Sequence, residues 1–307
     1  TEKRIHSFHL MRSLCLAKSA TNALARSFFK AFTTTALVKE NLVRIRSADE
    51  KTNDDWLFSE ENLRRATHDF EAIERKKIAG NRVPDARTVL VPLASINSKA
   101  HVLLTVQSTR FGTQMLAFPR GHRSRHTSER LDKDAIRQCC DQIGGKAEWA
   151  DPERVRYLGT HHDAVNAERG LAITPGVAYF GAISKREMRE RNREANCVLG
   201  VVAVRVEDCL VADNISVVKL SEEEGNDGEE IGPMPAFSLP RANVIGWGEP
   251  TNEGDVFGLK NCLIWGSDAA ILHGVLRVLV GSDARYKETL YKQYEKIRIE
   301  MGKAAEN

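Results

Sequence analysis

Four side chains on one predicted helix could do chemistry: Arg137, Gln138, Asp141 and Gln142. Residues 138, 141 and 142 are spaced i, i+3 and i+4, so they share one face of a helix. A divalent cation such as Mg²⁺ prefers carboxylate oxygens, and this face offers only the carboxylate of Asp141. The glutamines supply neutral oxygens and cannot act as general bases. The pattern has the outline of a catalytic motif, with a single carboxylate on this face.

The segment before this helix is basic. Residues 120–130 carry six arginines and histidines against the single acid Glu129. Arginine forks suit phosphate oxygens, and basic clusters bind RNA irrespective of its sequence. The alternative is an exposed basic loop that is neutralised by the acidic segment 221–232 of the same chain. The first interpretation predicts phosphate or RNA contacts from Arg120, His122, Arg123, Arg125 and Arg130.

Helices and strands must position these groups, and both are predicted from hydrophobic periodicity. Apolar residues at helical spacing predict helices over residues 60–76, 132–144, 268–279 and 285–301. Short apolar runs predict strands over 87–94, 100–107, 115–119, 154–159, 171–183 and 197–206. We expect Cys139 in the core, Cys140 half-exposed, and His161, His162 and Asp163 at the surface at the end of a strand.

Composition limits the class of protein. The chain has 307 residues, 42% hydrophobic and 28% charged, which is typical of soluble globular domains. No apolar run approaches 18 residues, so no transmembrane segment is expected. The six cysteines include no C-x-x-C pair, which argues against a structural zinc site and favours a reducing compartment.

Positive charge is concentrated at the N-terminus. Residues 1–48 carry nine Lys/Arg and two Asp/Glu, hence +7, whereas the rest of the chain carries −4. An arm rich in Arg, Ser and Ala and poor in acids is typical of a mitochondrial transit peptide. Docking on its own domain, or binding an acidic partner or RNA, would also suit it.

Four segments divide the chain into predicted units. The basic arm covers 1–48, and a linker with an amphipathic helix covers 49–84. An α+β domain covers 85–282 and contains an acidic insertion at 221–232. A charged C-terminal helix follows over 283–307.

Four sequence motifs occur in a recognisable order: VLVPLA (89–94), FPRG (118–121), AIRQCCDQIGG (135–145) and LIWGSDAAILHGVL (263–276). Together they resemble the Nudix hydrolase superfamily, most closely its coenzyme A diphosphatase branch, over roughly residues 85–282. The resemblance implies a Nudix fold, with a mixed β-sheet between helices. It also implies hydrolysis of a diphosphate with Mg²⁺ or Mn²⁺.

The Nudix box of this superfamily is degenerate here. With Arg137 on the family arginine, Gln138, Asp141 and Gln142 fall on three of its glutamates, and Glu129 falls on the early glutamate. The loop after the FPRG motif then has two extra residues. If the protein is active, the resemblance leaves only Glu129 and Asp141 as metal ligands.

Three functions follow from these observations. The leading hypothesis is a catalytically impaired Nudix-fold protein that needs no cofactor. It would act as a structural or RNA-binding subunit of a ribonucleoprotein complex, a mitoribosome or RNA-processing assembly, in the mitochondrial matrix. The alternative is an active Mg²⁺- or Mn²⁺-dependent hydrolase of coenzyme A derivatives or nucleoside diphosphates. A third possibility is a pocket that binds a phosphorylated RNA end through Arg120, Arg123 and Arg125 without turnover.

Overall fold

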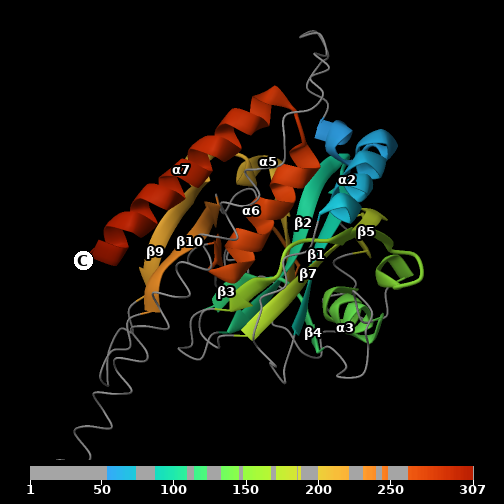
Figure 1. Cartoon of the computed structure of the whole chain (residues 1–307). Coiled ribbons are helices and arrows are strands. Elements are labelled where there is room, and N and C mark those ends of the chain that lie inside the picture. The colour runs from blue at the N-terminus through green and yellow to red at the C-terminus, as the bar shows by residue number, and fades with distance from the viewer. Residues whose placement is uncertain are drawn as a thin grey trace, which may run out of the picture.

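The chain forms an α+β structure built on one mixed sheet (Figure 1). The computed structural model describes residues 54–73, 87–108, 114–122, 133–144, 148–166, 171–184, 186–187, 200–220, 231–239, 244–247 and 262–306. The basic arm of residues 1–48 therefore lies outside the described residues. So do residues 123–132 of the basic loop and residues 221–230 of the predicted acidic insertion.

The main path of the sheet runs through eight strands. Its order is β5 (Arg156–Thr160), β7 (Leu171–Ala182), β1 (Arg87–Ile96), β2 (Lys99–Ser108), β3 (Gln114–Ala117), β12 (Cys262–Trp265), β10 (Ile231–Leu239) and β9 (Ile215–Leu220). β1 pairs with β7 in parallel, as β12 does with β3, whereas β1 and β2 pair antiparallel.

Four shorter or branching strands complete the sheet. β8 (Gly200–Arg205) pairs with β2 and with β11 (Ile245–Trp247). β4 (Arg120–His122) pairs with β1, and β6 (Ala164–Asn166) pairs with β7. Because β4 carries the start of the basic loop, its pairing fixes that loop to the central strand β1.

Helices cover both faces of the sheet. α3 (Lys133–Gly144) packs on one face, and α2 (Glu60–Ala72), α6 (Ser267–Val280) and α7 (Ala284–Glu306) belong to the core of the other. Side chains alternate along a strand, so β1 sends Val89, Val91 and Leu93 to the core of α2 and α6. Leu90 and Ala94 face the core of α3.

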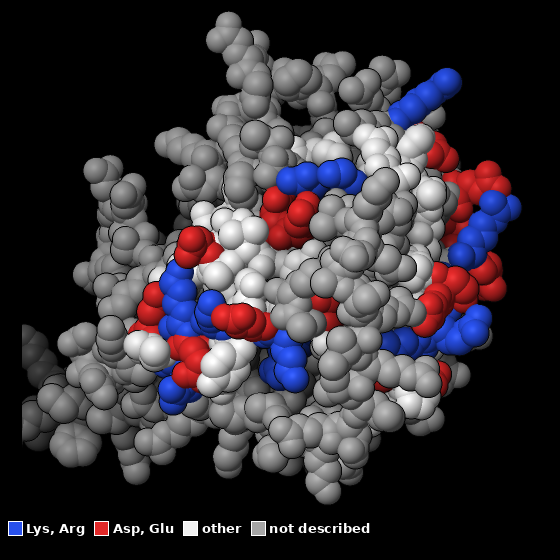
Figure 2. All heavy atoms as spheres, turned by 90° about the horizontal axis from the view of Figure 1, so that it is seen from above, with Lys and Arg blue, Asp and Glu red and all other residues white. Residues whose placement is uncertain are grey.

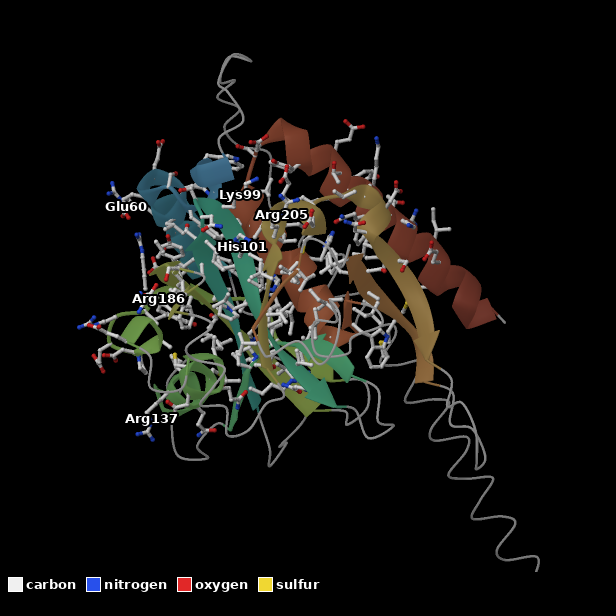
Figure 3. The ribbon with its side chains drawn as sticks, turned by 180° about the vertical axis from the view of Figure 1, so that it is seen from behind. Glu60, Lys99, His101, Arg137, Arg186 and Arg205 are labelled. Atoms are coloured by element: carbon white, nitrogen blue, oxygen red, sulfur yellow. The ribbon has the colours of Figure 1, made fainter. Side chains whose placement is uncertain are left out.

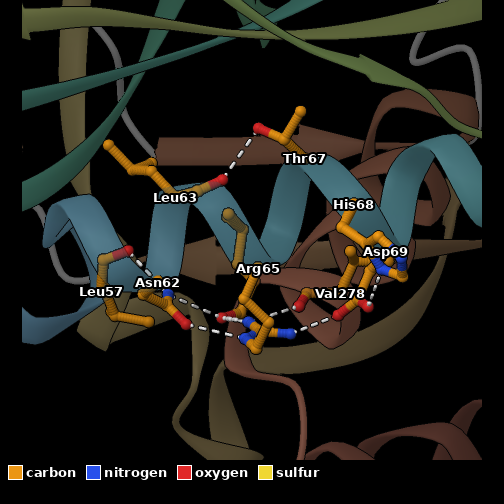
Figure 4. Close-up of polar contacts among 9 residues, drawn as sticks. Leu57, Asn62, Leu63, Arg65, Thr67, His68, Asp69 and Val278 are labelled. Carbon is orange, nitrogen blue, oxygen red and sulfur yellow. Dashed lines mark hydrogen bonds and ion pairs between the residues drawn. The ribbon is translucent and has the colours of Figure 1, made fainter.

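The N-terminal helix α2 is tied to the end of α6 (Figure 4). The Arg65 guanidinium donates to the carbonyl oxygens of Val278 and Leu279 at 2.9 and 2.6 Å, and Asn62 Nδ2 donates to Leu279 O at 3.1 Å. The last carbonyls of a helix lack partners within the helix. Arg65 and Asn62 supply those partners from a neighbouring helix.

Short helices and the long α7 complete the described elements. The short helices are η2 (Asp54–Phe58), η3 (Glu148–Ala150), α5 (Val206–Cys209) and η5 (Ala212–Asn214). In α7, Leu290, Gln293 and Ile297 are buried, and Gln293 Nε2 donates to the carbonyl oxygens of Cys209 and Val211 at 3.1 and 2.8 Å. α7 is therefore attached through the end of α5 as well as through apolar packing.

Most predicted elements are confirmed, with ends that move by a few residues. Helix 60–76 is α2, and Ser59 is its N-cap, with Oγ accepting from Asn62 N at 3.2 Å. The turn between the first two strands is at Asn97 and Ser98, which both have positive φ. No strand was predicted at β4, β6, β9, β10, β11 or β12, and β10 begins at Ile231, inside the predicted acidic insertion 221–232.

Candidate functional site

Helix α3 carries the four residues that the sequence singled out. Its inner face buries Cys139, Cys140 and Ile143 against the sheet. Arg137 and Asp141 are exposed, and Gln138 and Gln142 are half-buried. Figure 3 shows Arg137 directed away from the sheet. Asp141 is exposed, and no hydrogen bond or ion pair joins it to another of the described residues.

The Gln142 side chain is bonded to the backbone of the FPRG motif. Its Oε1 accepts from Arg120 N at 3.0 Å, and its Nε2 donates to Arg120 O at 2.7 Å. β4 pairs with β1 along one edge, with Arg120 opposite Val89. The amide of Gln142 therefore bonds both backbone groups of one residue, as a neighbouring strand would. This use requires both an acceptor and an N–H donor, and a carboxylate lacks the donor.

Arg120 and Asp268 form a second connection in the same segment. Arg120 Nη2 donates to Asp268 Oδ2 at 3.0 Å, and Phe118 N donates to the same oxygen at 3.2 Å. Asp268 lies in the first turn of α6 and its side chain is 3% exposed, against 24% for Arg120. Residues 118–120 thus join α6, on one face of the sheet, to α3, on the other.

The remaining predicted site residues are only partly placed. His122 is the last residue of β4, and nothing more is described of its side chain. Arg123, Arg125, Glu129 and Arg130 lie outside the described residues. The predicted contacts of these groups with phosphate or RNA stay predictions. The structure does bring Arg120, Gln142 and Asp268 together, a set that includes one residue the sequence analysis did not select.

A divalent cation does not fit the described part of this site. No three His, Cys, Asp or Glu side chains in the described ranges are grouped so that they could hold a metal ion. The amide of Gln142 is engaged by the backbone. Mg²⁺ favours several hard, charged oxygen ligands, and α3 presents only Asp141 on this face.

Two cysteine predictions have opposite outcomes. Cys139 is buried in the core, as predicted, and its Sγ donates to Pro119 O at 3.4 Å. Cys140 was expected to be half-exposed, but it is 1% exposed. Burial raises the pKa of the Cys140 thiol to about 12, so its thiolate, the reactive form, is scarce at neutral pH.

His161 and Asp163 are buried, so the prediction that they lie at the surface is wrong. Asp163 Oδ1 accepts from Thr174 Oγ1 at 3.1 Å. The His161 ring packs against Gly274 of α6, where an added Cβ would lie 2.7 Å from Cε1. Desolvation, followed by the nearby His162, lowers the pKa of His161 to about 3. His161 is therefore a neutral packing residue.

Asp268 is the residue that sequence analysis missed. Its signal was a lone acid at the start of an otherwise apolar run, SDAAILHGVLRVLV. An acid in the first helical turn is favoured by the helix dipole, so this position did not stand out. Only the three-dimensional structure brings Asp268, far along the chain, to Arg120.

Surface charge on the described residues is mixed. Figure 2 shows Lys and Arg interspersed with Asp and Glu on the face seen there. Several of these charges pair locally, as Lys292 does with Glu288 at 2.7 Å and Arg156 with Glu60 at 2.6 Å. None of the described helices is both long and apolar enough to span a lipid bilayer.

Comparisons with known proteins include distant structural similarities, of which two are given below. No protein-family model matches the chain, and neither does any curated protein. The crystal structure of a Nudix hydrolase from M. smegmatis, RenU, is 16% identical with a TM-score of 0.26, covering 40% of this chain and 72% of that one. The crystal structure of a MutT/nudix family protein from Enterococcus faecalis is 12% identical with a TM-score of 0.31, covering 85% and 94%. At these TM-scores neither similarity decides the fold, and the resemblance to the Nudix superfamily rests on the sequence motifs alone.

Proposed function

We propose that this chain is a Nudix-fold protein that does not hydrolyse diphosphates and serves as a phosphate- or RNA-binding subunit of a larger complex. The observation that supports it is the bonding of Gln142. Its side chain stands at a position where the Nudix box has a metal-binding glutamate, and it forms two hydrogen bonds with the backbone of Arg120.

A glutamate at position 142 could not form both of these hydrogen bonds. One carboxylate oxygen could still accept from Arg120 N, but the other would face the carbonyl oxygen of Arg120. Two acceptors in contact leave a half-buried polar group unsatisfied, which costs about 1–3 kcal/mol. The glutamine therefore fits a structural role that the family glutamate would disrupt.

The proposed ligand follows from the charge of the loop. Arg120, Arg123, Arg125 and Arg130 lie within eleven residues, opposed by Glu129. Guanidinium groups form paired hydrogen bonds with phosphate oxygens. A phosphorylated RNA segment or RNA end suits this loop better than a metal-bound diphosphate, because a basic loop repels the cation.

The cellular setting is also a proposal. The arm of residues 1–48 has the composition of a mitochondrial targeting segment, which supports the matrix and a ribonucleoprotein complex there. Fusion of residues 1–48 to a fluorescent protein tests the location: mitochondrial import is expected, and diffuse fluorescence would contradict it.

The purified full chain tests the loss of hydrolysis. Coenzyme A, nucleoside diphosphates and 5′-capped RNA are incubated with Mg²⁺ or Mn²⁺, beside an Asp141→Ala variant. No product above the rate of that variant is expected. The exposed carboxylate of Asp141 is the observation that favours the alternative, an active hydrolase. Turnover that disappears in Asp141→Ala would establish that alternative.

The binding half of the proposal needs its own assay. A 5′-phosphorylated single-stranded RNA should bind with an affinity that falls as salt rises, because each neutralised phosphate releases counterions. Joint replacement of Arg123, Arg125 and Arg130 by glutamate should weaken binding and flatten the salt dependence. An unchanged affinity would show that these loop arginines do not contact the RNA.

A further inference from the structure

The guanidinium of Arg120 already has an anion beside it. Arg120 Nη2 lies 3.0 Å from Asp268 Oδ2, and this carboxylate is 3% exposed whereas the arginine side chain is 24% exposed. An arginine proposed to bind phosphate is therefore in contact with a nearly buried carboxylate of its own chain. A phosphate at this guanidinium would have to share it with Asp268 or replace Asp268.

The bonding of Asp268 is one-sided. Both donors, Phe118 N and Arg120 Nη2, approach Oδ2. Oδ1 is buried and has no partner among the described residues. The backbone N–H of Phe118 requires only an acceptor, which an asparagine side chain also provides. Of these two donors only the guanidinium of Arg120 is charged, so this bond is the one that depends on the negative charge of Asp268.

The backbone around Arg120 stays in place if its side chain moves. Gln142 holds Arg120 N and O, and β4 is paired with β1 from Arg87 to Val89. Leu90 N also donates to Pro119 O at 3.1 Å. Rotation of the arginine side chain would break its bond with Asp268 without breaking any of these backbone bonds.

We propose that Asp268 is a built-in competitor for phosphate at Arg120, so that RNA binding requires the guanidinium to exchange Asp268 for a phosphate group. The proposal rests on the proposed function, since it concerns the same phosphate-binding segment. Asp268 lowers the affinity of Arg120 for isolated phosphates. A ligand that contacts several basic residues at once can supply the free energy of the exchange.

The variant Asp268→Asn tests the competition. It keeps an acceptor for Phe118 N, removes the carboxylate charge, and is expected to tighten binding of a 5′-phosphorylated single-stranded RNA about three- to tenfold in fluorescence anisotropy. Glu288→Gln is the matched control, because it removes one unit of charge on α7, which Figure 1 places away from β4. That control should leave the affinity unchanged.

A double-mutant cycle identifies the partner of Asp268. In an Arg120→Gln background, Asp268→Asn should no longer tighten binding, because the competed group is missing. Equal tightening with and without Arg120 would overturn the proposal. So would an affinity that is unchanged or weaker in Asp268→Asn alone.

A measurement on the unmodified protein covers the case in which Asp268→Asn fails to fold. The side-chain ¹⁵N signals of Arg120 are expected to shift when the RNA is added, because the guanidinium changes its anion. RNA binding without that shift overturns the competition and leaves the proposed function intact. If the unmodified protein does not bind the RNA, both proposals fail.

Discussion

The two faces of the sheet use polar side chains in the same way, although only one of them resembles a catalytic site. On the α6 face, Arg65 and Asn62 of α2 bond the last carbonyls of α6. On the α3 face, Gln142 bonds the two backbone groups of Arg120. Each side chain satisfies backbone groups that regular secondary structure leaves open.

The place of a residue in a motif does not by itself show whether its role is catalytic or structural. Arg65 belongs to no motif, and its bonds are structural. Gln142 lies in the stretch that resembles a Nudix box, and its bonds are of the same kind. If both are structural, their replacement should change stability, and replacement of Gln142 should not change any hydrolytic activity.

A fall in pH should produce the largest loss of stability, through buried histidines on the α6 face of the sheet. Burial, followed for His273 by Arg277, lowers the pKa of His161 to about 3 and of His273 to about 4. The unfolded chain, with histidine pKa near 6.5, binds more protons below that pH, so stability falls as pH drops from about 6.5. By pH 5 the loss for the two histidines together should be about 4 kcal/mol in urea unfolding.

His161→Gln should remove about half of this pH dependence. His68→Gln is the control, because the side chain of His68 is 82% exposed. An equally steep pH dependence in His161→Gln would show that the acid sensitivity arises elsewhere.

Arg65→Ala should cost about 3 kcal/mol of unfolding free energy. It removes charge-assisted bonds to two half-buried carbonyls, each worth about 1.5–3 kcal/mol. Arg64 provides the matched control on the same helix, with a side chain 79% exposed and 3.9 Å from Glu60. Arg64→Ala should change stability by less than about 0.5 kcal/mol. Equal losses for the two variants would contradict the proposed tie between α2 and α6.

Gln142→Glu should cost about 2 kcal/mol, because a carboxylate oxygen replaces the donor that faces Arg120 O. Asp141→Asn, one residue earlier on the exposed side of α3, should be nearly neutral. Chemical denaturation measures both. A stable Gln142→Glu variant that gains Mg²⁺-dependent hydrolysis would mean that position 142 is a site for chemistry.

Gly274→Ala should have the smallest effect, about 1 kcal/mol, through the close contact of the new methyl group with His161. In a His161→Ala background, Gly274→Ala should cost less unfolding free energy, because the obstructing ring is absent. Additive losses in thermal unfolding would show that the two residues are not in contact.

Local patterns predicted the elements better than they predicted the environment of single residues. Ser59, the two glutamates after it and the apolar spacing to Phe70 lie close in sequence, and α2 forms there. β9 and β10 flank an acidic segment and β10 carries two prolines, so their pairing depends on the rest of the sheet. Hydrophobic periodicity is a local signal and does not predict pairing between distant strands.

The site shows the same limit. The i, i+3, i+4 spacing put residues 138, 141 and 142 on one helix, but it could not show that Gln142 bonds Arg120. Asp268 is 148 residues from Arg120 in sequence, and no local pattern connects them. The burial of Cys140 and His161 depends likewise on which helix covers which strand.

Binding of Mn²⁺ to the full chain tests whether α3 carries a metal site at Asp141. Isothermal titration at millimolar Mn²⁺ is compared between the unmodified protein and Asp141→Ala. If Gln142 has a structural role and α3 no longer forms a metal site, the two titrations should coincide, with no binding that depends on Asp141. Saturable binding that disappears in Asp141→Ala would contradict the claim and restore this face of α3 as a catalytic metal site.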